Sequence, residues 1–145
     1  MYPTQHILAG LLFSAVLLLL YPTIGFLGAV IIFLVSFGID VDHYFFYIFK
    51  KRDFSFQRAY QYSIEQGKIA RAQGKQYSAP LNIFHTVEAL LMMGILSLYN
   101  RIMLFIFLGA LFHFILDFWY TVYVLRMPYA RRYTLSSYVR EKLFL

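Results

Sequence analysis

The stretch IGFLGAVIIFLVSFGIDVDHYFFYIF, residues 24–49, combines the length and apolarity of a membrane-crossing helix with three ionisable side chains. A helix needs about 20 apolar residues to cross about 30 Å of hydrocarbon. Asp40, Asp42 and His43 lie within four residues of one another in its second half. An ionisable group inside a bilayer costs about 3 kcal/mol on insertion scales, so such groups pair, face a cavity or do chemistry. Two carboxylates and an imidazole this close would repel or titrate unless a cation joined them.

The whole chain shares this membrane-like composition. Of its 145 residues, 61% are hydrophobic and 14% are charged, and the mean hydropathy is +0.62. Soluble domains are about 45–50% apolar and about 25% charged. We therefore expect an integral membrane protein with a single domain, residues 1–145. The absence of cysteine excludes both a disulfide framework and a thiolate metal site.

Four apolar stretches predict an all-α bundle of four transmembrane helices, at about residues 4–20, 24–49, 81–98 and 102–125. Strands are disfavoured because the runs are continuous, and because only helices or closed barrels satisfy the backbone in lipid. Residues 50–80 then form a basic connecting segment, and residues 126–145 form a tail. All Lys and Arg residues except Arg101 lie in this connecting segment or in the tail, which four spans place on the same side of the membrane. Arg101 lies on the opposite side. The positive-inside rule therefore predicts cytoplasmic termini and a cytoplasmic connecting segment.

The net charge of +6 indicates contact with anionic membrane lipids. Nucleic acid is excluded as a partner because the basic residues sit beside the apolar stretches and not on a soluble domain. Within residues 53–76, Tyr60 and Ile64 are four apart, which predicts either an amphipathic helix in the headgroup plane or a basic loop. Gly67 and Gly74 argue against one uninterrupted helix.

The other apolar stretches also carry ionisable side chains. They are His6 in the first, His85 and Glu88 in the third, and His113 and Asp117 in the fourth. In the four-span arrangement all of them lie in the cytoplasmic half of the bilayer, roughly 3–18 Å below one face. His113 and Asp117 are four residues apart and share a helical face. This agreement in depth predicts that all four helices contribute to one polar centre.

We interpret this centre as a site for one or two divalent metal ions, zinc first, with manganese or iron as alternatives, because imidazole and carboxylate ligands suit these metals. The expected ligands are His6, Asp42, His43, His85, His113 and Asp117. Asp40 and Glu88 are expected behind the ligands or as the general base. Two alternatives stay open: a proton or ion pathway, and a purely structural polar core in which His85 and Glu88 hold helices together.

A metal ion beside carboxylates lowers the pKa of a bound water molecule, which suits the hydrolysis of a phosphoester. The expected site opens at the headgroup level, where Lys50–Arg52 and Arg126 would attract phosphate. The predicted function is therefore a membrane-embedded, metal-dependent hydrolase acting on a phosphoester or lipid phosphate at the cytoplasmic leaflet. The alternatives are a small ion- or proton-coupled transporter and a non-catalytic metal-binding protein. Gly25, Gly28 and Ala29 could pack helices within one chain or between chains of a homo-oligomer.

The order of these polar elements resembles the YdjM-like family of membrane-bound, metal-dependent hydrolases. The elements that carry the resemblance are His6, Asp40-Val41-Asp42-His43, His85-Thr86 and His113-Phe114-Ile115-Leu116-Asp117. The resemblance implies a multi-helix membrane protein with a His/Asp metal centre and hydrolytic activity. Typical members have a longer His-Arg-Gly-x-Thr-His-Ser element where this chain has Phe84-His85-Thr86, which bears on the number of metal ions.

Overall fold

The computed structural model describes residues 3–74, 82–128, 133–136 and 139, and within these ranges the chain forms helices and turns without a β-strand. The expected all-α class is confirmed. The helices are α1 (Pro3–Leu20), α2 (Gly25–Gly38), α3 (Val41–Lys51), α4 (Phe56–Gln73), α5 (Val87–Ser97) and α6 (Arg101–Trp119). They are flanked by the short 3-10 helices η1 (Pro22–Ile24) and η3 (Ile83–His85) and by the π-helix η4 (Tyr120–Val124). Parts of the predicted connecting segment and tail lie outside the described residues.

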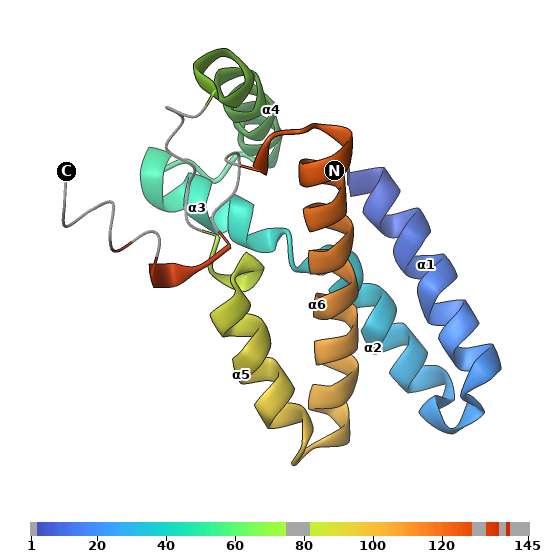
Figure 1. Ribbon diagram of the computed structural model, residues 1–145. Helices are drawn as coiled ribbons and strands as arrows, with labels where there is room; N and C mark the ends of the chain where they lie inside the picture. Colours follow the sequence, from blue (N-terminus) through green and yellow to red (C-terminus); the bar gives the residue numbers. More distant parts are fainter. Residues whose placement is uncertain (1–2, 75–81, 129–132, 137–138, 140–145) are drawn as a thin grey trace.

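Helices α1, α2, α5 and α6 form a bundle in which α6 lies between α5 and α2, and α1 packs on α2 (Figure 1). Helix α1 is antiparallel to α2 and α5 is antiparallel to α6, whereas α2 and α6 run in the same direction. The start of α1, helices α3 and α4, and the last turns of α6 gather at one end of this bundle. The connections from α1 to α2 and from α5 to α6 lie at the opposite end. This order brings the predicted polar positions of four helices toward a single end.

The stretch 24–49 is expected as one helix, but the structure divides it at a turn formed by residues 39 and 40. The Asp40 N–H donates to the carbonyl of Phe37 at 3.4 Å, whereas a regular α-helix would direct it to Ser36. Helix α3 then leaves the axis of α2 and runs toward α4 (Figure 1). The turn places the start of α3, with its polar residues, beside the end of the bundle.

Two helical runs, Pro22–Lys51 and Arg101–Val124, are long and apolar enough to cross a membrane. The other two predicted spans give shorter apolar helices, at Thr4–Leu20 and Val87–Ser97. The predicted span 81–98 is shortened because Thr86 caps the N-terminus of α5, its hydroxyl accepting a hydrogen bond from the Ala89 N–H at 3.3 Å. By length and composition, the structure therefore supports two of the four predicted spans.

The polarity of the bundle is inverted relative to that of a water-soluble protein. Leu8 is 68% exposed and Phe26 is 78% exposed, and apolar side chains of this kind cover the outer faces of the bundle helices. By contrast His113 is fully buried and Asp117 is 2% exposed, with Ser36 buried beside them. Large exposed apolar surfaces mark contact with lipid or with other proteins.

Glycine allows close contact between α6 and α2. A Cβ atom on Gly109 of α6 would lie 2.7 Å from the backbone oxygen of Ile32 and 2.9 Å from Cβ of Val35, both on α2. Gly28, which the sequence marks as a packing residue, has a similar role: a Cβ atom there would lie 2.8 Å from the Phe105 ring. Small residues at such crossings let backbones approach, as is common between membrane helices.

We expect Gly109→Ala to lower the free energy of unfolding by about 1–3 kcal/mol, because the added methyl group forces α6 away from the backbone of α2. Gly94→Ala is the matched control, since its Cβ atom would lie at an ordinary 3.4 Å from the Phe107 ring. Alanine also favours helix over glycine by about 1 kcal/mol. Thermal unfolding in one detergent measures both variants, and equal midpoints would contradict the assigned contact.

Residues 56–73 form one amphipathic helix, which resolves the alternative between helix and loop for this part of the connecting segment. Gly67 lies inside α4 without interrupting it, and Gly74 follows its end with a positive φ of 59°. The Ser55 hydroxyl caps its start by accepting from the Arg58 N–H at 3.3 Å. Local capping and the packing of α4 on α3 therefore outweigh the helix-weakening effect of a single glycine.

The junction between α3 and α4 is organised around the Asp53 carboxylate. It accepts hydrogen bonds from the Tyr47 hydroxyl and from the Ser55 N–H, the latter at 3.0 Å. The Arg58 guanidinium contacts both carboxylate oxygens, at 2.8 and 2.9 Å. The hydrogen bond from Tyr47, followed by those from Ser55 and Arg58, lowers the pKa of Asp53 below its ordinary value.

This lowered pKa predicts a pH-dependent contribution to the order of α4. A carboxyl group whose pKa is lower in the folded state stabilises that state above the unfolded pKa, about 3.9, and the contribution is lost as the pH falls through the lower folded pKa. We expect Asp53→Asn to increase hydrogen exchange across residues 56–73 at about pH 6, and to differ less from the parent at about pH 3, which is below the unfolded pKa. A difference that is the same at both pH values would contradict this account.

Candidate metal centre

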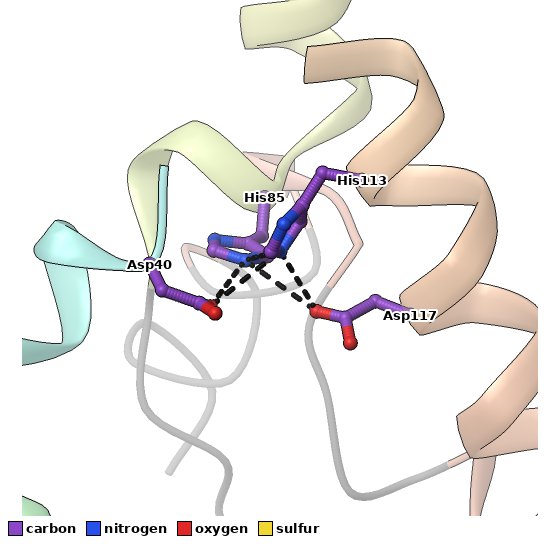
Figure 2. Close-up of side chains that lie close together, drawn as sticks. All are labelled: Asp40, His85, His113 and Asp117. Carbon is purple, nitrogen blue, oxygen red and sulfur yellow. Dashed lines mark hydrogen bonds and ion pairs between the residues drawn. The ribbon is translucent and has the colours of Figure 1, made fainter. Parts of the chain in front are cut away.

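Four side chains from three segments direct one ligand-type atom each at a common point (Figure 2). His113 and Asp117 come from one face of α6, His85 from η3, and Asp40 from the turn between α2 and α3. Their chosen ligand atoms all lie within 4.8 Å of one another. His85, His113 and Asp117 are buried, and Asp40 is 28% exposed. This buried Asp/His group has the composition and the spacing to hold a metal ion.

The distances inside the group match a tetrahedral ion site. The Nε2 atoms of His85 and His113 are 2.9 Å apart. Oδ1 of Asp40 lies 3.3 Å from the first of these nitrogens and 3.5 Å from the second. Oδ2 of Asp117 lies 3.5 Å and 3.2 Å from the same two atoms. Ligand bonds of about 2.0–2.2 Å in a tetrahedron give ligand–ligand separations of about 3.3–3.6 Å, and the four distances between an imidazole nitrogen and a carboxylate oxygen are close to this range.

The hydrogen bond made by Nδ1 of each imidazole determines whether Nε2 carries a proton or a lone pair. His113 Nδ1 lies 2.8 Å from the Ser36 carbonyl oxygen, which can only accept, so Nδ1 is the protonated nitrogen. His85 Nδ1 lies 3.0 Å from Oδ2 of Asp42 and is protonated for the same reason. In the neutral rings both Nε2 atoms therefore carry lone pairs. Histidine ligands in metal sites have this arrangement, with the far nitrogen bonded to a carbonyl or carboxylate.

Two lone pairs facing each other at 2.9 Å, with two carboxylate oxygens beside them, repel unless a positive charge lies between them. A proton can bridge only two of the four atoms. A divalent cation contacts all four at once and offsets the charge of both carboxylates. The convergence of four acceptor atoms therefore favours a metal ion over a shared proton.

The helix break at residues 39 and 40 produces two parts of this geometry. It brings the Asp40 carboxylate to the ligand group and directs the Asp40 N–H to Phe37, which leaves the Ser36 carbonyl for His113. The sequence analysis did not identify Ser36 as part of the site. The signal that could have found it is a serine one helical turn before an aspartate, followed by Gly38 in an otherwise apolar helix.

Asp42 is expected as a ligand, but its Oδ2 atom lies behind His85, where it also accepts a hydrogen bond from the Phe84 N–H at 3.2 Å. Asp40 occupies the position among the ligand atoms instead. Asp42, His43 and His85 form a second group with ligand spacing, but it uses His85 as well. Because His85 Nδ1 is the donor to Asp42 when Nε2 is a ligand, the two groups compete for this ring.

His6 is expected as a ligand, and its Nε2 atom contacts Oδ1 of Asp117 at 3.2 Å. Its ring stacks on that of His113, with centroids 4.1 Å apart and planes 16° apart. Gly10, one turn later, lets α1 approach, because a Cβ atom there would overlap the Ser36 hydroxyl. His6 therefore holds the outer oxygen of Asp117, while Oδ2 faces the ligand group. The Nδ1 atom of His6 is buried without a hydrogen-bond partner among the described residues.

His43 is partly exposed and lies beside Asp40, with Nε2 3.5 Å from Oδ1 of that residue. Its ring is tilted against that of His85, with centroids 5.1 Å apart. Both His43 and Asp40 line a cavity of 780 Å³ bounded by α3, α4 and the end of α6. The centre therefore opens toward this cavity on the side of Asp40 and His43.

Glu88 is expected as a base or supporting group, but it belongs to neither ligand group. Its Oε1 atom accepts a hydrogen bond from the Leu135 N–H at 3.0 Å. The Val87 N–H likewise donates to the carbonyl of Tyr133 at 2.8 Å. In this structure Glu88 holds the segment 133–136 against the start of α5, next to the turn that carries His85.

Comparison of the chain with protein-family models, with curated proteins and with solved structures gives no match. The case for the centre therefore depends on its own geometry.

The position of Asp42 predicts a measurable effect on metal affinity. We expect Asp42→Asn to weaken metal binding by about 10- to 100-fold, as for other groups that orient a histidine ligand. Glu88→Gln is the control, because it changes a buried carboxylate of α5 that is in neither ligand group and leaves affinity unchanged. Competition with a chromogenic chelator measures both variants, and equal affinities would show that Asp42 does not orient His85.

Proposed function

We propose that the chain is a multi-pass membrane protein in which α1, the run of α2 and α3, α5 and α6 each enter or cross the bilayer. The inverted polarity of the bundle and its two long apolar runs support this arrangement. The basic residues of α3 and α4 gather at the end of the bundle opposite Arg101, which begins α6. The positive-inside rule then puts the end with α4 in the cytoplasm.

We propose further that the centre binds one zinc ion through Asp40, His85, His113 and Asp117. The single observation that carries this is the convergence of two imidazole Nε2 atoms and two carboxylate oxygens on one point. Manganese and iron accept the same donors, but the near-tetrahedral separations favour zinc. The resemblance of the motifs to the YdjM-like family agrees with this choice.

The proposed activity is the hydrolysis of a phosphoester. A bound zinc ion would lower the pKa of water that reaches it through the cavity. In the reaction, the water oxygen bonds to phosphorus, the water gives up a proton, and the bond to the leaving oxygen breaks as that oxygen gains a proton. His43 lines the cavity beside the ligand Asp40, with Nε2 3.5 Å from Oδ1 of that residue, and is placed to accept the first proton and deliver the second.

A second candidate is a metal-binding protein without catalytic activity. Four protein ligands close a tetrahedral site, and closed sites are the rule where zinc is structural. The exposure of Asp40 on the cavity side favours the hydrolase, because this ligand is the one that can make room for water.

Metal content and phosphatase activity, measured on the same samples, test the proposal. We expect the parent to hold about one zinc per chain and to hydrolyse phosphate esters, and His113→Ala to lose both, with activity falling at least about 100-fold. His43→Gln should keep the metal and lose most of the activity. A parent that binds zinc without hydrolysing any ester supports the non-catalytic candidate, and full zinc occupancy in His113→Ala refutes the site.

A further inference from the structure

The cavity beside the centre is larger than a phosphate group needs. Its volume of 780 Å³ lies within the range of about 300–1,000 Å³ that is typical of ligand pockets. Asp40 and His43 lie on its wall, so a molecule in the cavity has access to the metal centre. The remaining wall therefore has the space to select the substrate.

One wall of the cavity is a face of α4. Tyr60, Ile64, Lys68 and Arg71 follow one another at intervals of three or four residues, and all four line the cavity. No carboxylate among the described residues pairs with Lys68 or Arg71. The sequence analysis assigned phosphate attraction to other basic residues, Lys50–Arg52 and Arg126, which do not line this cavity.

The other walls are mainly apolar. Phe37, Val41 and Phe46 line the cavity on the side of α2 and α3, and Leu125 lines it beyond the end of α6. The cavity thus combines an end with the candidate metal ligands, an apolar wall and two cationic side chains that pair with no carboxylate in the part of the chain that the structure describes. This combination fits an amphiphile with an anionic head and an apolar tail.

Charge balance explains why the cations of α4 are needed. In the proposed site a divalent ion is offset by the carboxylates of Asp40 and Asp117, so the centre as a whole carries no excess positive charge. A lipid phosphate whose tails stay in the bilayer holds its negatively charged head in this largely apolar cavity and away from bulk water, which is costly without a partner. Lys68 and Arg71 are the described cations on its wall and can supply charge-assisted hydrogen bonds.

The surroundings of α4 point to a substrate taken from the bilayer. Phe56 lies at the start of α4 and on the cavity wall, and it is 74% exposed, with the ring of Phe54 exposed just before it. Exposed aromatic side chains on a basic amphipathic helix are typical of a helix at the lipid headgroup level. A lipid in that layer could place its head in the cavity while its tails stay in the membrane.

We propose that α4 is the substrate-recognition wall of the cavity, with Lys68 and Arg71 binding the anionic head of a membrane lipid phosphate. This inference rests on the proposed hydrolase function and adds to it the class of substrate and the residues that select it. A small soluble phosphate ester would reach the metal centre without depending on α4.

The test uses the full chain in mixed micelles with phosphatidic acid, and with p-nitrophenyl phosphate as the soluble ester. We expect Lys68→Gln and Arg71→Gln each to raise KM for phosphatidic acid by about 3- to 10-fold. The kcat value, the zinc content and the rate with p-nitrophenyl phosphate stay unchanged. Arg52→Gln removes the same charge outside the cavity and should leave KM at the parent value. Binding of phosphatidic acid at equilibrium is measured in parallel on all variants.

The outcomes separate this inference from the proposed function. An equal rise in KM for Arg52→Gln, or an equal effect on both esters, overturns the recognition role of α4. Hydrolysis of p-nitrophenyl phosphate without hydrolysis or binding of phosphatidic acid also overturns it, while the hydrolase proposal stands. If the parent hydrolyses neither ester, the hydrolase proposal fails. Binding of phosphatidic acid that requires Lys68 and Arg71 then still supports the recognition site, and binding that does not require them refutes it.

Discussion

The imidazole nitrogens of His85 and His113 point at each other across 2.9 Å because the other nitrogen of each ring is already a donor. One donates to the Ser36 carbonyl and the other to the Asp42 carboxylate. This constraint removes the freedom of either ring to turn away or to change tautomer. Together with the carboxylate oxygens of Asp40 and Asp117, these nitrogens form a cluster of electron-rich atoms inside the bundle. A cation stabilises such a cluster, whereas burying it in an apolar core without a cation is costly.

The rest of the fold can be understood as support for this arrangement. Helix α2 ends early, and the turn at residues 39 and 40 frees a carbonyl for His113 and brings in Asp40. Helix α1 approaches closely at Gly10, which puts the His6 ring on that of His113 and its Nε2 atom on Asp117. The segment 133–136 is held on the start of α5, next to the turn that carries His85. The Ser36 carbonyl and His6 each act on a ligand through its outer atoms, which is how surrounding residues orient a metal site.

The bundle helices place their apolar side chains outside and their polar side chains inside, which accounts for both the exposed surface and the buried centre. The bundle hides its polar side chains and exposes its leucines and phenylalanines, which suits a hydrocarbon surrounding in which only polar groups gain by burial. Helix α4 differs because it is amphipathic, basic and at the end of the bundle where the centre opens. A site that opens toward a basic helix is suited to a molecule that lies at the membrane surface.

The sequence alone determined the all-α class, the helical faces of α6, and the residue types of the centre. A spacing of four between His113 and Asp117 fixes their shared face whatever the helix packs against. It did not determine that Asp40, and not Asp42, lies beside His113 and Asp117, or the positions of His6 and Glu88. Side chains of neighbouring residues at a helix break point in different directions, and the direction of each side chain depends on the residue at which the first helix ends. Only the tertiary structure decided these points, because the carbonyl of Ser36, the approach of α1 at Gly10 and the wall formed by α4 all depend on contacts between segments far apart in the chain.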